Sequence, residues 1–109
     1  MDLSGKFVYL SGAMTGHDDW NKQSFDAAVN ELTGMGASFV FNPTDGAPNV
    51  DDALDHSYYM LIDLHELTQA YKSKPIYDVI AMLPGWEYSY GARIEHSVAI
   101  ACGIKPIYL

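Results

Sequence analysis

Four short strand-like runs alternate with three segments of helical periodicity, and this order restricts the fold more than any other feature. The strand-like runs are Phe7–Leu10, Ser38–Phe41, Val79–Leu83 and Lys105–Leu109. The helical segments cover about residues 21–35, 52–71 and 89–101. A strand–helix order that repeats in this way predicts an α/β fold, in which a parallel sheet of about four strands is flanked by helices.

For such a chain we expect the strand order 2-1-3-4, counted along the sequence. Strands one and three are then neighbours, and the order reverses between them. Ligands of open α/β sheets bind at this reversal, beyond the carboxyl ends of the strands. The loops 11–16 and 83–89 follow strands one and three. The sequence therefore predicts a small-molecule site between these two loops.

The composition of the two loops agrees with a site. The loop 11–16 is glycine-rich and can present backbone N–H groups, although a turn that merely needs its glycines explains it as well. Ser89 suits the N-cap of the next helix, and Glu95 then falls in its second turn, with its carboxylate leaning toward an anion-binding helix end. We expect Trp86 and Tyr88 to form aromatic walls beside it.

Length and charge narrow the functional classes. The chain has 109 residues, which indicates one domain, and its net charge of −8 argues against nucleic-acid polymers and anionic membranes. No stretch is apolar enough to span a membrane and the N-terminus lacks signal-peptide features, so we expect a cytoplasmic protein. Cys102 is the single cysteine, and we expect it to be buried. The histidines are scattered, so we expect neither a metal nor a cofactor.

Three motifs occur in order along the chain: Tyr9–Gly16, Ile62–Leu64 around Asp63, and Ser89–Glu95. In order and spacing they resemble the nucleoside 2-deoxyribosyltransferase superfamily, which includes the 2′-deoxynucleoside 5′-monophosphate N-glycosidases. The resemblance covers nearly all of residues 1–109 and is nearest to a short branch of the superfamily. It implies a single domain with a small flavodoxin-like or Rossmann-like sheet.

The resemblance also implies roles for individual residues. Glu95 would be the nucleophile that attacks C1′, Tyr9 would hydrogen-bond it, and Asp63 would hold the sugar or help to protonate the leaving base. Helical periodicity alone places Asp63 on an exposed stripe, so its role in a site depends on the resemblance. The residues expected to bind substrate are Gly12, Thr15, Gly16, Trp86, Ser89 and Gly91.

Within the superfamily, Ser89 resembles the monophosphate hydrolases, which place Ser here where the transferases place an acid. Ala13 and Thr15 differ from the Ser and Arg of the hydrolases' phosphate loop. We therefore expect an N-glycosidase acting on a (deoxy)nucleoside 5′-monophosphate or a nucleoside. The alternatives are a nucleoside deoxyribosyltransferase and a non-catalytic nucleotide-binding module. Because the chain is short and rich in aromatic residues, we also expect a homodimer or higher homo-oligomer.

Overall fold

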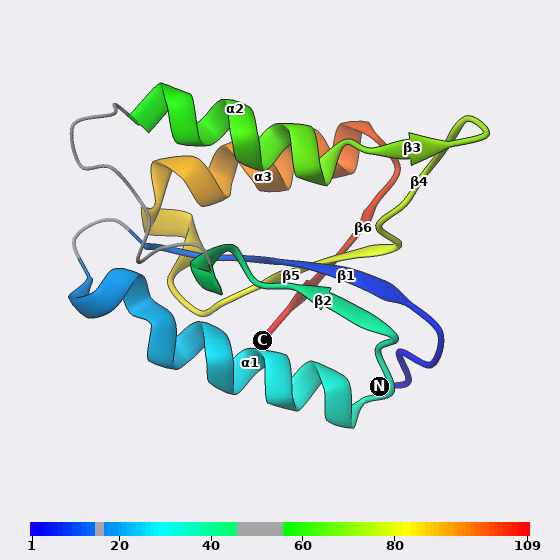
Figure 1. Ribbon diagram of the computed structural model, residues 1–109, viewed down its shortest axis with the longest axis horizontal. Coiled ribbons are helices and arrows are strands. Elements are labelled where there is room, and N and C mark those ends of the chain that lie inside the picture. The colour runs from blue at the N-terminus through cyan, green and yellow to red at the C-terminus, as the bar shows by residue number, and fades with distance from the viewer. Residues whose placement is uncertain (15–16, 46–55) are drawn as a thin grey trace.

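The computed structural model describes residues 1–14, 17–45 and 56–109. One parallel sheet lies at the centre of the molecule, in the order β2-β1-β5-β6 (Figure 1). Its strands are β1 (Phe7–Ser11), β2 (Phe39–Phe41), β5 (Val79–Met82) and β6 (Lys105–Tyr108). Both the α/β class and the 2-1-3-4 order of the four main strands are thus confirmed.

Within the described residues, three α-helices cover the two faces of this sheet. Helix α1 (Lys22–Gly34) packs on one face, and α2 (His56–Leu67) and α3 (Tyr90–Ala101) pack on the other (Figure 1). Short 3₁₀ turns, η1 (Asp18–Asn21) and η3 (Trp86–Tyr88), precede α1 and α3. The first turn of the helix expected over 52–71 lies outside the described residues.

The end of that expected helix is wrong, because α2 stops at Leu67 and a hairpin follows. Strand β3 (Ala70–Tyr71) pairs antiparallel with β4 (Lys74–Pro75), and the pair projects from the molecule (Figure 1). Its two-residue turn, Lys72 and Ser73, has φ angles of 53° and 66°. Positive φ at both positions matches the twist of a tight hairpin. Neither residue is a glycine, so the sequence does not predict this turn.

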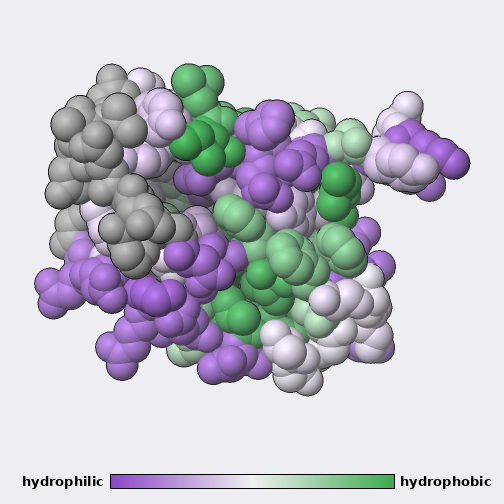
Figure 2. Space-filling model, in the orientation of Figure 1, coloured by the Kyte–Doolittle hydropathy of each residue, from purple (hydrophilic) through white to green (hydrophobic). Residues whose placement is uncertain are grey.

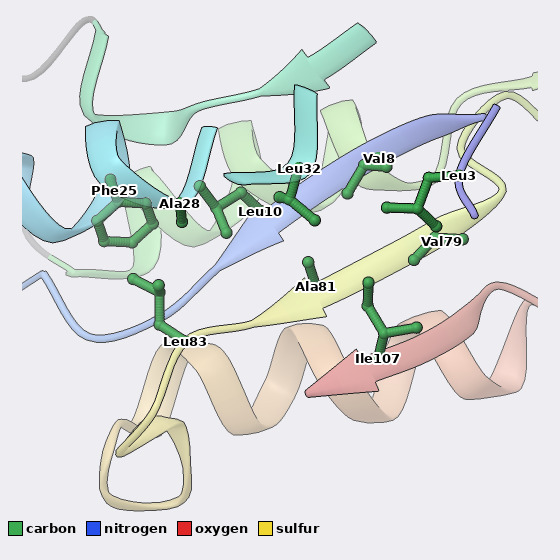
Figure 3. Packing of buried hydrophobic residues seen from close by; sticks show 10 residues of the cluster. All are labelled: Leu3, Val8, Leu10, Phe25, Ala28, Leu32, Val79, Ala81, Leu83 and Ile107. Atoms are coloured by element: carbon green, nitrogen blue, oxygen red, sulfur yellow. The ribbon is translucent and has the colours of Figure 1, made fainter. Parts of the chain in front are cut away.

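Alternate residues of β1 and β5 point to opposite faces of the sheet. On the α1 face they join a wholly apolar cluster, shown in Figure 3, with members Leu3, Val8, Leu10, Phe25, Ala28, Leu32, Val79, Ala81, Leu83 and Ile107. On the α2–α3 face the cluster consists of Tyr9, Leu67, Tyr77, Ile80, Met82, Ala92, Ala99 and Ile104. The sheet is therefore covered on both sides, and of the two clusters only the second includes hydroxyl groups, those of Tyr9 and Tyr77. Buried polar residues next to α1 lie at the edge of the sheet, where Asn42 donates to Asp26.

Cys102 and several apolar residues of β2 and α2 lie at the surface. Cys102 is exposed and not buried, because α3 ends at Ala101 and Cys102 is its C-cap, at the surface. Figure 2 shows hydrophobic residues gathered over the edge strand β2 and on α2, where Phe39, Leu61 and Ile62 are exposed. These residues agree with self-association, which stays a prediction. In the described part of the chain, no helix is both long and apolar enough to cross a membrane.

Candidate active site

A buried carboxyl group, that of Glu95, lies between α3 and the carboxyl end of β1. Glu95 is 6% exposed. The hydroxyl of Tyr9 donates to its Oε2, and the Oγ of Ser11 donates to its Oε1 at 2.7 Å. Tyr9 and Ser11 are alternate residues of one strand, so both side chains face the same side of the sheet. Each oxygen of the carboxyl group thus receives a hydroxyl donor from β1.

Tyr9 is fixed by its own surroundings. Its ring stacks on Phe41 with 5.0 Å between centroids and meets the edge of Tyr77 at 5.6 Å. Its hydroxyl also lies 3.4 Å from the backbone carbonyl oxygen of Asp63 on α2, a second acceptor. Burial first and the nearby Glu95 second raise the pKa of Tyr9 well above its ordinary value. Tyr9 therefore keeps its proton and acts as a hydrogen-bond donor.

The ionisation of Glu95 is balanced between opposing effects. Burial raises its pKa, the Tyr9 hydroxyl lowers it, the charge of Asp63 raises it and the Ser11 hydroxyl lowers it, with a resulting pKa of about 7. At neutral pH both the carboxylate and the carboxylic acid are populated. A carboxyl group shifted in this way can serve as a nucleophile, a base or an acid, and such shifts are concentrated at functional sites.

Glu95 forms part of the wall of a cavity of about 120 Å³, here called the first cavity. Asp63 and two neighbours on α2, Tyr59 and Met60, line it from above the sheet. The complete set of described lining residues is Gly12, Met14, Trp20, Pro43, Tyr59, Met60, Asp63, Ser89, Gly91, Ala92 and Glu95. Asp63 is half-buried here and not on an exposed stripe. Two carboxyl groups therefore share one small, largely apolar space.

The close approach of the two loops depends on Gly12. A Cβ atom at Gly12 would lie 2.8 Å from the Cβ of Leu83, which is shorter than side chains tolerate. The backbone N–H of Leu83 also donates to the carbonyl of Ser11 at 2.9 Å. The loops that begin after β1 and β5 therefore meet at the expected reversal of strand order.

A second cavity, of about 570 Å³, adjoins the first and shares Ser89 and Gly91 with it. Its described lining residues are Ala13, His17, Asn21, Pro84, Gly85, Tyr88, Ser89, Tyr90 and Gly91. Ser89 is the N-cap of α3, as expected, and its Oγ accepts from the backbone N–H of Ala92 at 3.2 Å. The amino end of α3 thus lies between the two cavities.

Most of the expected site residues come together. Those around the first cavity are Tyr9, Gly12, Asp63, Ser89, Gly91 and Glu95. Thr15 and Gly16 lie outside the described residues. Trp86 is placed elsewhere: its ring stacks on His96, with 4.3 Å between centroids, and on Tyr108 at 6.0 Å. Trp86 is not among the described lining residues of either cavity, because η3 turns its ring toward β6, whereas Tyr88, the other expected wall, lines the second cavity.

The aromatic walls of the first cavity are Trp20 and Tyr59, which the sequence reasoning missed. Trp20 is the middle of three successive residues in left-handed conformation, with φ of 49° for Asp19, 57° for Trp20 and 63° for Asn21. Asn21 Nδ2 donates to the carbonyl of Ala13 at 2.9 Å and ties this turn to the glycine loop. Asp and Asn are among the non-glycine residues that adopt this conformation most often, but Trp seldom does, so the sequence gives only a weak signal for the turn.

Ser11 was also missed as a partner of Glu95, although a signal existed. It follows Tyr9 by two positions, and strand alternation alone would have put both hydroxyls on one face. Over residues 1–14, 17–45 and 56–109, no group of three or more His, Cys, Asp or Glu side chains is arranged to hold a metal ion.

The fold and the site define a small parallel α/β protein with a buried carboxyl group at the carboxyl ends of its central strands. Comparison with protein-family models matches residues 6–108 to a domain of unknown function, DUF4406, and the chain belongs to this family. Comparison with curated proteins and with solved structures found no match in either case.

Proposed function

We propose that the protein is an N-glycosidase that cleaves the base–sugar bond of a nucleoside 5′-monophosphate or nucleoside, with Glu95 as nucleophile. The observation that carries the proposal is the pair of hydroxyl donors, Tyr9 and Ser11, on a buried carboxyl group that lines a cavity. A carboxylate that only stabilises the fold would not have to line a cavity, and one that only binds a ligand would not have to be buried. Glu95 does both, which favours a catalytic role. The resemblance of the three motifs to the deoxyribosyltransferase superfamily supports the same reading.

The reaction consists of two displacements at C1′. In the first, a Glu95 carboxylate oxygen bonds to C1′ while the C1′–N bond breaks, and the electron pair of that bond leaves with the base, which takes a proton from water or from the protonated form of Asp63. In the second, water attacks C1′, the bond to Glu95 breaks, and the water's proton returns to Asp63 or solvent. The sum consumes one water and regenerates the enzyme, as in retaining glycosidases.

The ionisation of the two carboxyl groups suits these steps. Glu95 must be ionised to attack, and its pKa of about 7 leaves a substantial carboxylate fraction at neutral pH. The hydroxyls of Tyr9 and Ser11 stabilise that carboxylate, which is otherwise penalised by its burial. Asp63 lines the same cavity and can approach either the sugar or the leaving base.

The walls of the first cavity suit a flat heterocycle. Trp20 and Tyr59 supply aromatic surface, and Met14 and Met60 supply adaptable apolar contacts. The second cavity, next to the amino end of α3, would then receive the remainder of the substrate. The protein would work inside the cell on free nucleotides or nucleosides, as a homodimer or higher homo-oligomer, without nucleic-acid polymers or membranes as partners.

Chromatographic release of free base tests the proposal. The protein is incubated with nucleosides, deoxynucleosides and their 5′-monophosphates, beside Glu95→Gln and the matched control Glu87→Gln. Glu87 lies on η3 and is exposed, so its replacement makes the same chemical change without touching the first cavity as described. We expect base release by the wild type and the Glu87 variant, and a loss of at least about a thousandfold in Glu95→Gln.

Two further arms separate the alternatives. An added acceptor base that is converted to a new nucleoside would identify a transferase. No release from any substrate, together with nucleotides that raise the melting temperature of both the wild type and Glu95→Gln, would overturn catalysis in favour of a binding module.

A further inference from the structure

We infer that Ser11 is a positioning residue that, together with Tyr9, fixes the plane in which the Glu95 carboxyl group faces the first cavity. The effect of Ser11 on reaction rate rests on the proposed function, whereas its effect on Glu95 does not. The resemblance to known glycosidases assigned a partner of Glu95 at Tyr9 alone.

Ser11 is held in place by the sheet. It is 1% exposed and is the last residue of β1, where it pairs with Met82 of β5. Its own carbonyl accepts the N–H of Leu83, and the next residue, Gly12, packs directly against Leu83. The backbone on both sides of Ser11 is therefore fixed, and its Oγ is presented from a rigid element.

The carboxyl group of Glu95 would be able to rotate if only one hydrogen bond held it. The terminal torsion of a glutamate is broad, so a carboxyl group held by one oxygen can still swing about it. Here the Tyr9 hydroxyl holds Oε2 and the Ser11 Oγ holds Oε1 at 2.7 Å. Two donors on different oxygens, both from β1, leave the carboxyl group one orientation. A nucleophile must be held within a narrow range of geometry to react efficiently.

Ser11 acts through Glu95 and not on the ligand. Glu95 lines the first cavity, whereas Ser11 is not among the described residues that do. Its hydroxyl favours the ionised form of Glu95, because a carboxylate accepts the hydrogen bond more strongly than the acid does. Loss of this donor should therefore make Glu95 harder to ionise as well as less well oriented.

The test compares Ser11→Ala with Ser11→Cys, which keeps approximately the same volume but donates only weakly. Ser97→Ala, an exposed position on α3, is the matched control. Among the described residues, the titratable groups that act on Glu95 are Tyr9 on β1 and Asp63 on α2, with Tyr77 behind Tyr9, and Tyr59 on α2 lines the same cavity; all four are kept in every variant.

The first readout is the pH profile of base release. We expect the rise in kcat to move to higher pH by about one unit in Ser11→Ala, with kcat on the plateau about tenfold lower and KM within about twofold. Ser11→Cys should shift in the same direction, and Ser97→Ala should match the wild type. A profile in Ser11→Ala and Ser11→Cys that equals that of the wild type would overturn the inference.

The second readout needs no activity. Stability measured by chemical denaturation should fall from the ordinary pKa of Glu95, 4.5, up to its pKa of about 7 in the folded protein, and in Ser11→Ala the upper end of this fall should move to higher pH. In a Glu95→Gln background, Ser11→Ala should cause no such movement. If the wild type releases no base, the proposed function fails while this comparison still decides the inference. A movement that persists without the Glu95 carboxyl group would contradict it. If Ser11→Ala does not fold, Ser11→Cys serves in both readouts.

Discussion

The two faces of strand β1 have opposite characters. Val8 and Leu10 point into the wholly apolar cluster beneath α1, while Tyr9 and Ser11 point to Glu95 beneath α2 and α3. The backbone is shared, and neighbouring residues differ only in the side of the sheet to which they point. One face can be optimised for packing while the other holds a buried ionisable group at an energetic cost.

This difference separates stability from chemistry. The α1 face follows the general behaviour of apolar cores, in which buried side chains stabilise at any pH. The opposite face contains a carboxyl group whose pKa burial has raised to about 7, so its contribution changes with pH. The comparison between the faces can be tested from either side.

The largest expected effect on stability comes from the apolar face. Leu10→Ala should lower the free energy of unfolding by about 3–4 kcal/mol, because it leaves a cavity beside α1 where Leu10 is fully buried. The loss should be the same at pH 5 and pH 8, and base release by the folded variant should keep its pH profile. Denaturation at the two pH values measures this loss. A loss that differs between pH 5 and pH 8 would contradict the claim that the α1 face stabilises the protein independently of pH.

A smaller effect of opposite sign is expected from Glu95→Gln. The folded protein binds a proton at Glu95 between its ordinary pKa of 4.5 and the raised value of about 7, whereas the unfolded chain has released it. Stability due to this group is therefore present below pH 4.5, falls as pH rises, and is lost above pH 7. The span corresponds to roughly 3 kcal/mol.

Glu95→Gln should thus be more stable than the wild type at pH 8, by up to about 3 kcal/mol, and nearly equal to it at pH 4. Glu87→Gln should show no such difference. Denaturant titrations across this pH range measure the difference. A Glu95→Gln variant that is less stable than the wild type at pH 8 would contradict the claim that the buried Glu95 carboxylate destabilises the folded protein.

The smallest expected effect concerns Trp20 and Trp86, the two tryptophans of the chain. Trp20 lines the first cavity, whereas Trp86 stacks on His96. In a Glu95→Gln background, Trp20→Ala should weaken nucleotide binding about tenfold, because stacking of one base contributes about 1–3 kcal/mol. Trp86→Phe should leave the affinity unchanged. The tryptophan fluorescence of this variant comes from Trp20 alone, and nucleotide binding should quench it. Weaker binding in Trp86→Phe, but not in Trp20→Ala, would show that Trp86 and not Trp20 contacts the base.

The sheet and its order could be predicted from the sequence because each strand is an uninterrupted short run between helical segments. The positions of Glu95 and Ser89 could also be predicted, since the N-cap signal fixes the register of α3. The hairpin of β3 and β4 could not, because its strands are two residues long and its turn has no glycine. The pattern there reads as a continuing helix.

Of the two expected aromatic walls, Tyr88 lines the second cavity, but Trp86 lines neither cavity as described. Trp86 follows a strand that leads to the site, but the direction of its ring depends on η3 and on packing against His96, which sequence proximity does not reveal. Trp20 reaches the cavity through three successive left-handed residues, and although Asp and Asn favour this conformation, Trp does not. Motif order locates a site along the chain, whereas its walls depend on tertiary packing.

The central claim, that Glu95 is a nucleophile on the polar face of β1, is tested most directly by trapping the covalent intermediate. Protein mixed with the best substrate of the panel is quenched in acid during turnover and digested, and the peptide that contains Glu95 is examined by mass spectrometry. We predict an added mass equal to the sugar or sugar phosphate without its base, in the wild type and Glu87→Gln but not in Glu95→Gln. Base release that continues in Glu95→Gln without any adduct would contradict the account.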